Sequence, residues 1–245
     1  MEFDSPGLDI EMNEKESTDV ATRCATVLNL DTASLSDEYY YQSLPFCLID
    51  AVYSVGARYA STRLTIIRYC ERYRLQRIRA DKKSMPSKAS QHSISEFLFN
   101  AKEKGTSELA SSIFCNKQLT STKGGILKAE AAIEFAEILK QHGVEYFQEI
   151  LKIIDNTGFE RNIRGIPGQK SGISLSYFFM LSGSENLIKP DRMILRFLYN
   201  TLDREVTTRE ARAIISHAYD LLKPRYPKLT LRLLDHQIWG YQKKR

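Results

Sequence analysis

The chain has 245 residues, of which 42% are hydrophobic and 27% charged, the composition of an ordinary water-soluble globular protein. This length suits one large domain or two closely packed lobes. No apolar run approaches the length of a membrane-spanning helix, and the acidic start lacks the basic and apolar regions of a secretory signal. We therefore expect neither a membrane span nor secretion.

Cysteine and histidine are too scattered to predict a metal or redox site. The sequence contains four of each, and no pair is spaced as CxxC, HxxxH or HExxH. We expect the cysteines to be buried free thiols in a reducing cytosol. They are Cys24, Cys47, Cys70 and Cys115.

The formal net charge of +5 is unevenly distributed. Residues 1–20 contain seven acidic side chains and one lysine, a net charge of −6, so the rest of the chain carries +11. Because this segment also lacks a sustained apolar period, we predict a mobile acidic tail over residues 1–30, with a short surface helix as the alternative. A folded domain is predicted over residues 31–245, and its basic surplus is a weak indication of a polyanionic partner.

The first strongly predicted helix covers residues 44–60, a nearly continuous apolar run that is too long for a buried strand. Residues 63–79 follow with a helical period of apolar side chains between arginines, which form either a solvated basic face or a face turned toward phosphates. Residues 84–93 are predicted as a polar linker.

Helical periods continue to the end of the chain, and no stretch shows the alternation typical of a strand. Gly143 gives one helix its stop, and Thr207 with Glu210 forms a capping box for another. We therefore predict an all-α protein without internal repeats. The remaining predicted helices cover residues 94–104, 107–114, 126–143, 144–155, 172–181, 191–202, 208–222 and 229–242.

The stretch IRGIPGQKSGISLSYFF, residues 163–179, places three of the twelve glycines directly before an apolar helix. Glycine permits positive φ and a close backbone approach, and the first N–H groups of a helix are unpaired and point outward. Together with the helix dipole they form an anion site, to which Lys170 and Ser171 would add a charge and a hydroxyl. The alternative is a simple connection between helices, which also commonly contains glycine.

The stretch KPDRMILRFL, residues 189–198, places Asp191 directly before an amphipathic helix. Aspartate at this position is commonly an N-cap. The helix dipole also favours its ionised form, so Asp191 could stabilise a developing positive charge or orient a water molecule.

In their order and spacing, these segments resemble the helix–hairpin–helix (HhH-GPD) superfamily of DNA glycosylases. The family signature reads approximately L-P-G-x-G-x-x-T-A, an apolar helix, and then V-D-x-x-V-x-R. IPGQKSGIS (166–174) and KPDRMILRF (189–197) stand in the corresponding places. GGILKAEAAIEFAEIL, LIDAVYSVGARYASTR and the closing LDHQIWGYQ are also similar to segments of the family, so the resemblance covers most of residues 40–245.

The chain departs from the family pattern at three places. Lys170 replaces the second glycine of the hairpin, and Gly172 stands where members with lyase activity carry a catalytic lysine. Gly56 stands where some members insert glutamine into DNA, with Arg58 or Tyr59 as candidate replacements. No cysteine lies in the C-terminal half, where some members bind an iron–sulfur cluster.

The resemblance implies a two-lobed helical fold and a monofunctional DNA N-glycosylase without lyase activity, acting in base-excision DNA repair. A base of double-stranded DNA would be flipped into a pocket between the lobes. Asp191 would then stabilise the oxocarbenium-like sugar and direct a water at C1′. We expect a monomer that is cytoplasmic or lies with DNA in a nucleoid or nucleus.

The resemblance also implies that the hairpin binds a backbone phosphate, with no cofactor other than a monovalent cation held by main-chain carbonyls. Such a contact positions the protein on DNA without reading the sequence. The residues expected to contact DNA are Gly165, Gly168, Gln169, Lys170, Ser171, Gly172, Arg58 and Arg196.

The identity of the excised base stays open: it is damaged, deaminated, or deliberately modified, the last suiting defence against foreign DNA. Aromatic stacking is the usual means of holding a flipped base, and the candidates are Tyr39, Tyr40, Tyr41 and Tyr53, with simple core packing as the alternative. Two other functions also remain open. One is a catalytically inactive DNA-binding relative, and the other is a helical protein-interaction module.

Overall fold

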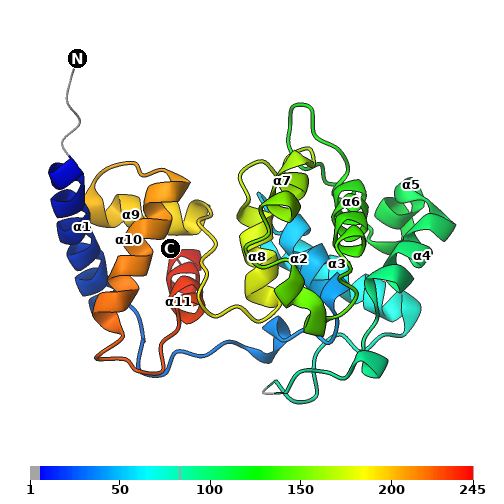
Figure 1. Ribbon diagram of the computed structural model, residues 1–245, viewed down its shortest axis with the longest axis horizontal. Helices are drawn as coiled ribbons and strands as arrows, with labels where there is room; N and C mark the ends of the chain where they lie inside the picture. The colour runs from blue at the N-terminus through cyan, green and yellow to red at the C-terminus, as the bar shows by residue number, and fades with distance from the viewer. Residues whose placement is uncertain (1–5, 83, 245) are drawn as a thin grey trace. The chain divides into compact units, whose positions relative to one another are not determined.

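The computed structural model describes residues 6–82 and 84–244, and helices make up the regular structure of this part of the chain (Figure 1). Two isolated bridges, Tyr41 with Ile78 and Leu119 with Leu127, are its only β-pairing. The all-α prediction is confirmed. The α-helices are α1 (Pro6–Val27), α2 (Leu44–Tyr53), α3 (Tyr59–Tyr73), α4 (Ile94–Lys104), α5 (Thr106–Glu108), α6 (Lys128–Gln141), α7 (Thr157–Gly165), α8 (Ile173–Leu181), α9 (Arg192–Leu202), α10 (Thr208–Leu222) and α11 (Leu231–Lys243).

The chain divides into two compact units. Unit 1 combines Met1–Leu35 with Ser184–Arg245, and unit 2 is the continuous segment Ser36–Gly183. Helices α1, α9, α10 and α11 therefore belong to unit 1, and α2 to α8 belong to unit 2. None of the helices within the described residues is long and apolar enough to cross a membrane.

Helix α1 is part of the core of unit 1, which corrects the prediction of a mobile tail over residues 1–30 from Ser17 onward. The side chains of Ser17, Val20, Ala21 and Cys24 are buried at helical spacing, and α1 packs against α9 and α10. This buried face could not be recognised in the sequence, because three of its four residues are small and weakly hydrophobic. Arg204 further fixes α1, since its guanidinium lies 2.6 Å and 2.8 Å from the two carboxylate oxygens of Glu16.

Helix α2 lies at the centre of unit 2, and all ten of its residues are buried. It contacts α3, α4, α6 and α8 (Figure 1). The helix predicted over residues 44–60 ends early, at Tyr53, because Gly56 adopts a φ of +66° that no right-handed helix contains. A turn over residues 54–58 then leads into α3.

Two other predicted helices differ in type. Residues 107–114 are shared between α5 and a five-residue π-helix, Leu109–Ile113. Residues 144–155 contain only a 3₁₀ helix, η4 (Phe147–Lys152). The carboxylate of Glu149 accepts the N–H groups of Glu145 and Tyr146 at 2.7 Å and 3.0 Å, which caps the start of η4.

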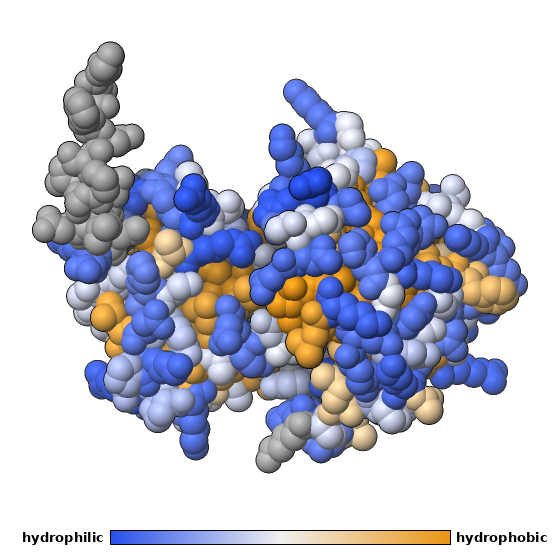
Figure 2. All heavy atoms as spheres, in the orientation of Figure 1, coloured by the Kyte–Doolittle hydropathy of each residue, from blue (hydrophilic) through white to orange (hydrophobic). Residues whose placement is uncertain are grey.

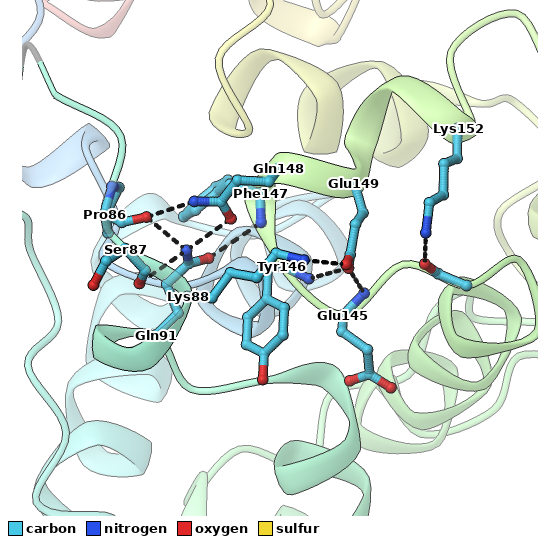
Figure 3. Close-up of polar contacts among 11 residues, drawn as sticks. Pro86, Ser87, Lys88, Gln91, Glu145, Tyr146, Phe147, Gln148, Glu149 and Lys152 are labelled. Carbon is cyan, nitrogen blue, oxygen red and sulfur yellow. Dashed lines mark hydrogen bonds and ion pairs between the residues drawn. The ribbon is translucent and has the colours of Figure 1, made fainter.

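The predicted linker over residues 84–93 is fastened to η4 through the side chain of Gln91 (Figure 3). Its amide nitrogen donates to Pro86 O at 2.8 Å and to Gln148 Oε1 at 3.0 Å, and its amide oxygen accepts from Phe147 N at 3.1 Å. Lys88 adds an ion pair with Glu149 at 2.7 Å. The segment is therefore a bound part of unit 2 rather than a loose linker.

Hydrophilic side chains cover most of the face drawn in Figure 2. The large apolar side chains that are exposed include Leu151 on η4 and Phe99 on α4, which lie on different elements. Single exposed apolar side chains are ordinary at protein surfaces and indicate no site by themselves.

The Glu149 cluster predicts a specific dependence of stability on pH. Burial alone would raise the pKa of Glu149, but the ammonium of Lys88 and the two backbone N–H groups lower it to about 2 from the usual 4.5. The lowered pKa means that the cluster stabilises the fold above pH 4.5, and that this contribution is lost as the pH falls through about 2. We expect Glu149→Gln to lower the free energy of unfolding by about 1 kcal/mol at neutral pH, with the difference vanishing in acid.

Urea unfolding at a series of pH values measures this effect. Glu137→Gln is the control, because Glu137 forms an exposed pair with Lys102 at 3.4 Å, and we expect it to cost only a few tenths of a kcal/mol. A Glu149→Gln difference that stays constant down to pH 2 would contradict the assigned role.

Candidate functional site

The hairpin between α7 and α8 begins with a tight turn over Ile166–Gln169. Gln169 N donates to Ile166 O at 2.9 Å, Pro167 occupies the second position, and Gly168 has a φ of +83° in the third, as in a type II turn. A side chain at Gly168 would also collide with its neighbour, because an added Cβ would lie 2.5 Å from Thr120 Cβ. Both the positive φ and the close contact with Thr120 therefore require glycine at this position.

A second turn follows at once over Gln169–Gly172. Gly172 N donates to Gln169 O at 2.9 Å, and Gly172 has a φ of +70° at the N-cap of α8. Arg164 at the end of α7 reaches across to donate to Lys170 O at 2.9 Å, and its guanidinium occupies the space of a Cβ at Gly172. These bonds hold the hairpin in one shape between its two helices.

The outer side of the hairpin presents Lys170 and Ser171, whose side chains are both exposed. The backbone N–H groups of these two residues have no partner within the described residues. Gln169, in contrast, is buried and bonds to the hydroxyl of Ser174, so its side chain braces the hairpin from inside. The predicted anion site at the hairpin thus consists of two unpaired main-chain donors beside one ammonium and one hydroxyl.

Arg58 stands in the turn between α2 and α3, where it precedes the first residue of α3. Its side chain is exposed and makes no hydrogen bond or ion pair in the part of the chain that the structure describes. Lys128 holds this turn in place, because its ammonium donates to Tyr53 O at 2.9 Å and to Val55 O at 2.8 Å. The structure therefore presents a free guanidinium on an anchored turn.

The basic segment 63–79 is less available than its composition indicates. Arg63 pairs with Glu38 at 2.9 Å, and Arg68 donates to the carbonyl of Phe114 at 3.2 Å. Arg79 donates to Tyr41 O at 2.8 Å and lies over the ring of Phe147. Several arginines of this segment are thus engaged in holding unit 2 together.

The four candidate tyrosines have different surroundings. Tyr39 stacks on Tyr59 with ring centroids 5.7 Å apart, and Tyr41 donates to Asp50 Oδ2 at 2.9 Å. Tyr53 packs edge-on against Phe114 at 5.4 Å, as a core residue does. Tyr40 is half-buried, and its carbonyl accepts from the N–H of Arg79 at 2.9 Å.

Asp50 was missed by the sequence analysis although it forms the polar centre of this aromatic group. It is fully buried on α2, and its negative charge affects the tyrosines around it. Burial raises the pKa of Tyr41 well above its usual value, and the negative charge of Asp50 raises it further. The signal that could have revealed Asp50 is a single acid inside the apolar run LPFCLIDAVY.

Asp191 is the N-cap of α9 in unit 1. One carboxylate oxygen, Oδ1, accepts the N–H groups of Met193 at 2.8 Å and Ile194 at 3.4 Å. The other oxygen has no hydrogen-bond partner among the described residues, and the side chain is partly exposed. Capping therefore leaves half of the carboxylate available.

Arg196 lies one turn further along α9 and is engaged within unit 1. Its guanidinium donates to the side-chain oxygen of Gln242 at 2.7 Å and also to the carbonyl of Gln242. These bonds tie α9 to α11, so its predicted contact with DNA would compete with a structural role.

The described residues contain no group of three or more histidine, cysteine, aspartate or glutamate side chains that could hold a metal ion. The four cysteines are free thiols. Cys24, Cys47 and Cys70 are buried, as expected, but Cys115 is exposed.

The hairpin geometry predicts how three glycines respond to substitution by alanine. Gly168→Ala forces a side chain into left-handed backbone and against Thr120, so we expect it to lower the free energy of unfolding by about 1–3 kcal/mol. Gly172→Ala should cost about 1–2 kcal/mol, because the flexible Arg164 can move aside.

Gly165→Ala is the matched control in the same hairpin. Gly165 ends α7 with open space around it and no positive φ, so alanine should raise stability by up to about 1 kcal/mol. Urea unfolding of the three variants measures this order, and equal effects at all three positions would contradict the two-turn geometry.

No curated protein and no solved structure matches the chain. A family model, Domain of unknown function (DUF8548), matches residues 18–243. The matched region includes the hairpin, Asp191 and all of α11, and the chain accordingly belongs to the DUF8548 family.

Proposed function

We propose that this chain is a monofunctional DNA N-glycosylase that binds double-stranded DNA and hydrolyses the bond between a damaged or modified base and its sugar. The observation that carries the proposal is the hairpin of two consecutive turns, with the unpaired N–H groups and exposed side chains of Lys170 and Ser171. Main-chain donors ahead of a helix suit a phosphate oxygen. The hairpin occupies the residues that resemble the glycosylase signature.

In this proposal, DNA binding depends on the hairpin and on Arg58. The backbone N–H groups of the hairpin bind a phosphate, Lys170 adds charge, and the guanidinium of Arg58 enters the duplex or contacts its backbone. Main-chain carbonyls of the hairpin are the candidate ligands for a monovalent cation. None of these contacts reads a base sequence.

The chemical step depends on Asp191. Its unengaged oxygen is available to face the sugar as the bond to the base breaks and positive charge develops, and to orient the attacking water. The cap fixes the carboxylate before substrate binds, so little reorganisation is needed. No Schiff base is expected at Gly172, which carries no amine.

A base would be held by aromatic stacking, for which Tyr59, stacked on the buried Tyr39, is an accessible ring. Tyr59 is partly exposed at the edge of the stack, whereas Tyr53 lies in the core. The excised base and the choice between repair and defence are questions for a substrate screen.

A non-catalytic DNA-binding protein is the second candidate, and one observation favours it. Asp191 is a good N-cap, so the need to begin α9 explains an aspartate there without any chemistry. The following two experiments test DNA binding and catalysis separately.

Lys170→Glu tests the hairpin as a phosphate site. We expect weaker binding to duplexes of any sequence, and a slope of log affinity against log salt that is smaller by about 1 than for the wild type. Lys102→Glu is the control, because it makes the same charge change on α4, outside the proposed interface. Equal losses in both variants would mean that only the net charge matters and that the hairpin is not a specific contact.

Asp191→Asn tests the chemistry. Duplexes that each carry one lesion or modified base are first screened for alkali-sensitive abasic sites. On the substrate found, the variant should release base about a hundred to a thousand times more slowly, since comparable preorganised groups contribute about 2.7–4 kcal/mol. The amide still caps α9, so we expect the melting temperature to change little.

Asp220→Asn is the control for this variant, because it makes the same change at an exposed position of α10. Wild-type rates for Asp191→Asn would reduce Asp191 to a helix cap. A screen in which no substrate is cleaved, together with salt-dependent duplex binding, would favour the non-catalytic protein.

A further inference from the structure

Asp235 is a buried acid that the proposed function does not use. It lies in the second turn of α11, and only 8% of its surface is exposed. Buried aspartates are rare unless a partner or a proton compensates the charge. A partner or a bound proton is therefore expected to compensate the buried carboxyl group of Asp235.

The carboxyl group of Asp235 is bonded to the segment that carries Asp191. Its Oδ1 accepts the N–H of Lys189 at 2.9 Å, and the carbonyl of Lys189 accepts the N–H of Asp191 at 2.6 Å. Pro190, between them, has a fixed φ and no N–H. One short turn thus joins the carboxyl group of Asp235 to the N-cap of α9.

The charges that act on Asp235 come from both sides of this turn. Asp191 and Lys189 lie before α9, and Arg232 lies on α11 itself, where it is buried and pairs with Glu185 at 3.1 Å. Burial raises the pKa of Asp235 to about 7, and the negative charge of Asp191 raises it too. The N–H of Lys189 and the cations of Lys189 and Arg232 act in the opposite direction.

We propose that Asp235 is a positioning residue for Asp191, and that the two carboxyl groups form a coupled pair across the turn at Lys189. Asp235 is enclosed and accepts the N–H of Lys189, whereas Asp191 is partly exposed at the N-terminus of α9. Asp235 is therefore the member of the pair that keeps a proton, because burial disfavours its charged form.

The raised pKa also fixes the direction of the pH effect on stability. The folded state binds the proton of Asp235 more tightly than the unfolded state, whose aspartate titrates near 3.8. The corresponding stabilisation is complete below that value and is lost as the pH rises through about 7. Above this range the site contains two negative charges.

Carboxyl ¹³C NMR of the full chain, labelled at the aspartate side chains, tests the coupling without any substrate. We expect one aspartate to titrate near pH 7 in the wild type and this titration to be absent in Asp235→Asn. Asp191→Asn keeps the N-cap but removes the charge, so it should lower the midpoint of Asp235 by on the order of one pH unit. Asp220→Asn, on exposed α10, should leave the midpoint unchanged.

An unchanged midpoint in Asp191→Asn overturns the pair. This measurement is made with Asp235 in place, so it does not depend on how well Asp235→Asn folds. It is also independent of catalysis: coupling without base release would leave the pair established and the proposed glycosylase wrong.

The positioning role rests on the proposed function and has its own measurement. Asp235→Asn keeps an oxygen that can accept the N–H of Lys189 but resembles the protonated acid at every pH. The single-turnover rate of the wild type should show an inflection near pH 7. The variant should lack this inflection and match the wild-type rate measured on its acidic side. An inflection retained in Asp235→Asn would overturn the positioning role.

Discussion

A helix that is buried on every side cannot leave the carbonyl groups of its last turn to water, and α2 is such a helix. The ammonium of Lys128 meets this need, since it donates to Tyr53 O, Val55 O and Gln118 Oε1. Lys128 is also the first residue of α6, so one buried cation joins the end of α2 to the beginning of α6. An unsatisfied buried carbonyl costs about 1–3 kcal/mol, and this contact avoids more than one. The turn that carries Arg58 takes its position from the same contact.

Several cations of this molecule hold its elements in place. Arg68, Arg79 and Arg164 each donate to a main-chain carbonyl, and Arg204 joins α1 to the rest of unit 1. These four guanidinium groups are thus engaged within the protein. Arg58 and Lys170, in contrast, have exposed side chains on constrained turns, where a phosphate contact would be fixed in position.

The helices were predictable where apolar spacing is dense, as in α2, α6 and α10, and where caps are explicit, as at Thr207 and Asp191. The prediction failed for α1, whose buried face consists mainly of small side chains, and for residues 144–155, which contain a short 3₁₀ helix where an α-helix was expected. The hairpin glycines and Asp191 could be selected from spacing alone. Asp50 was marked in the sequence only as a single acid inside an apolar run. Asp235 could not be selected, because its role comes from burial and from the partner Lys189, which is 46 positions away.

Unit 1 is assembled from the two ends of the chain, and this imposes an order on biosynthesis. When α1 leaves the ribosome, the helices that cover Val20 and Cys24 have not yet been translated. Unit 2 is continuous in sequence, so it can fold while the apolar face of α1 is still exposed to water. The many acidic residues near the N-terminus give this segment a strong negative charge, and such charge opposes association with other chains while α9, α10 and α11 are still absent.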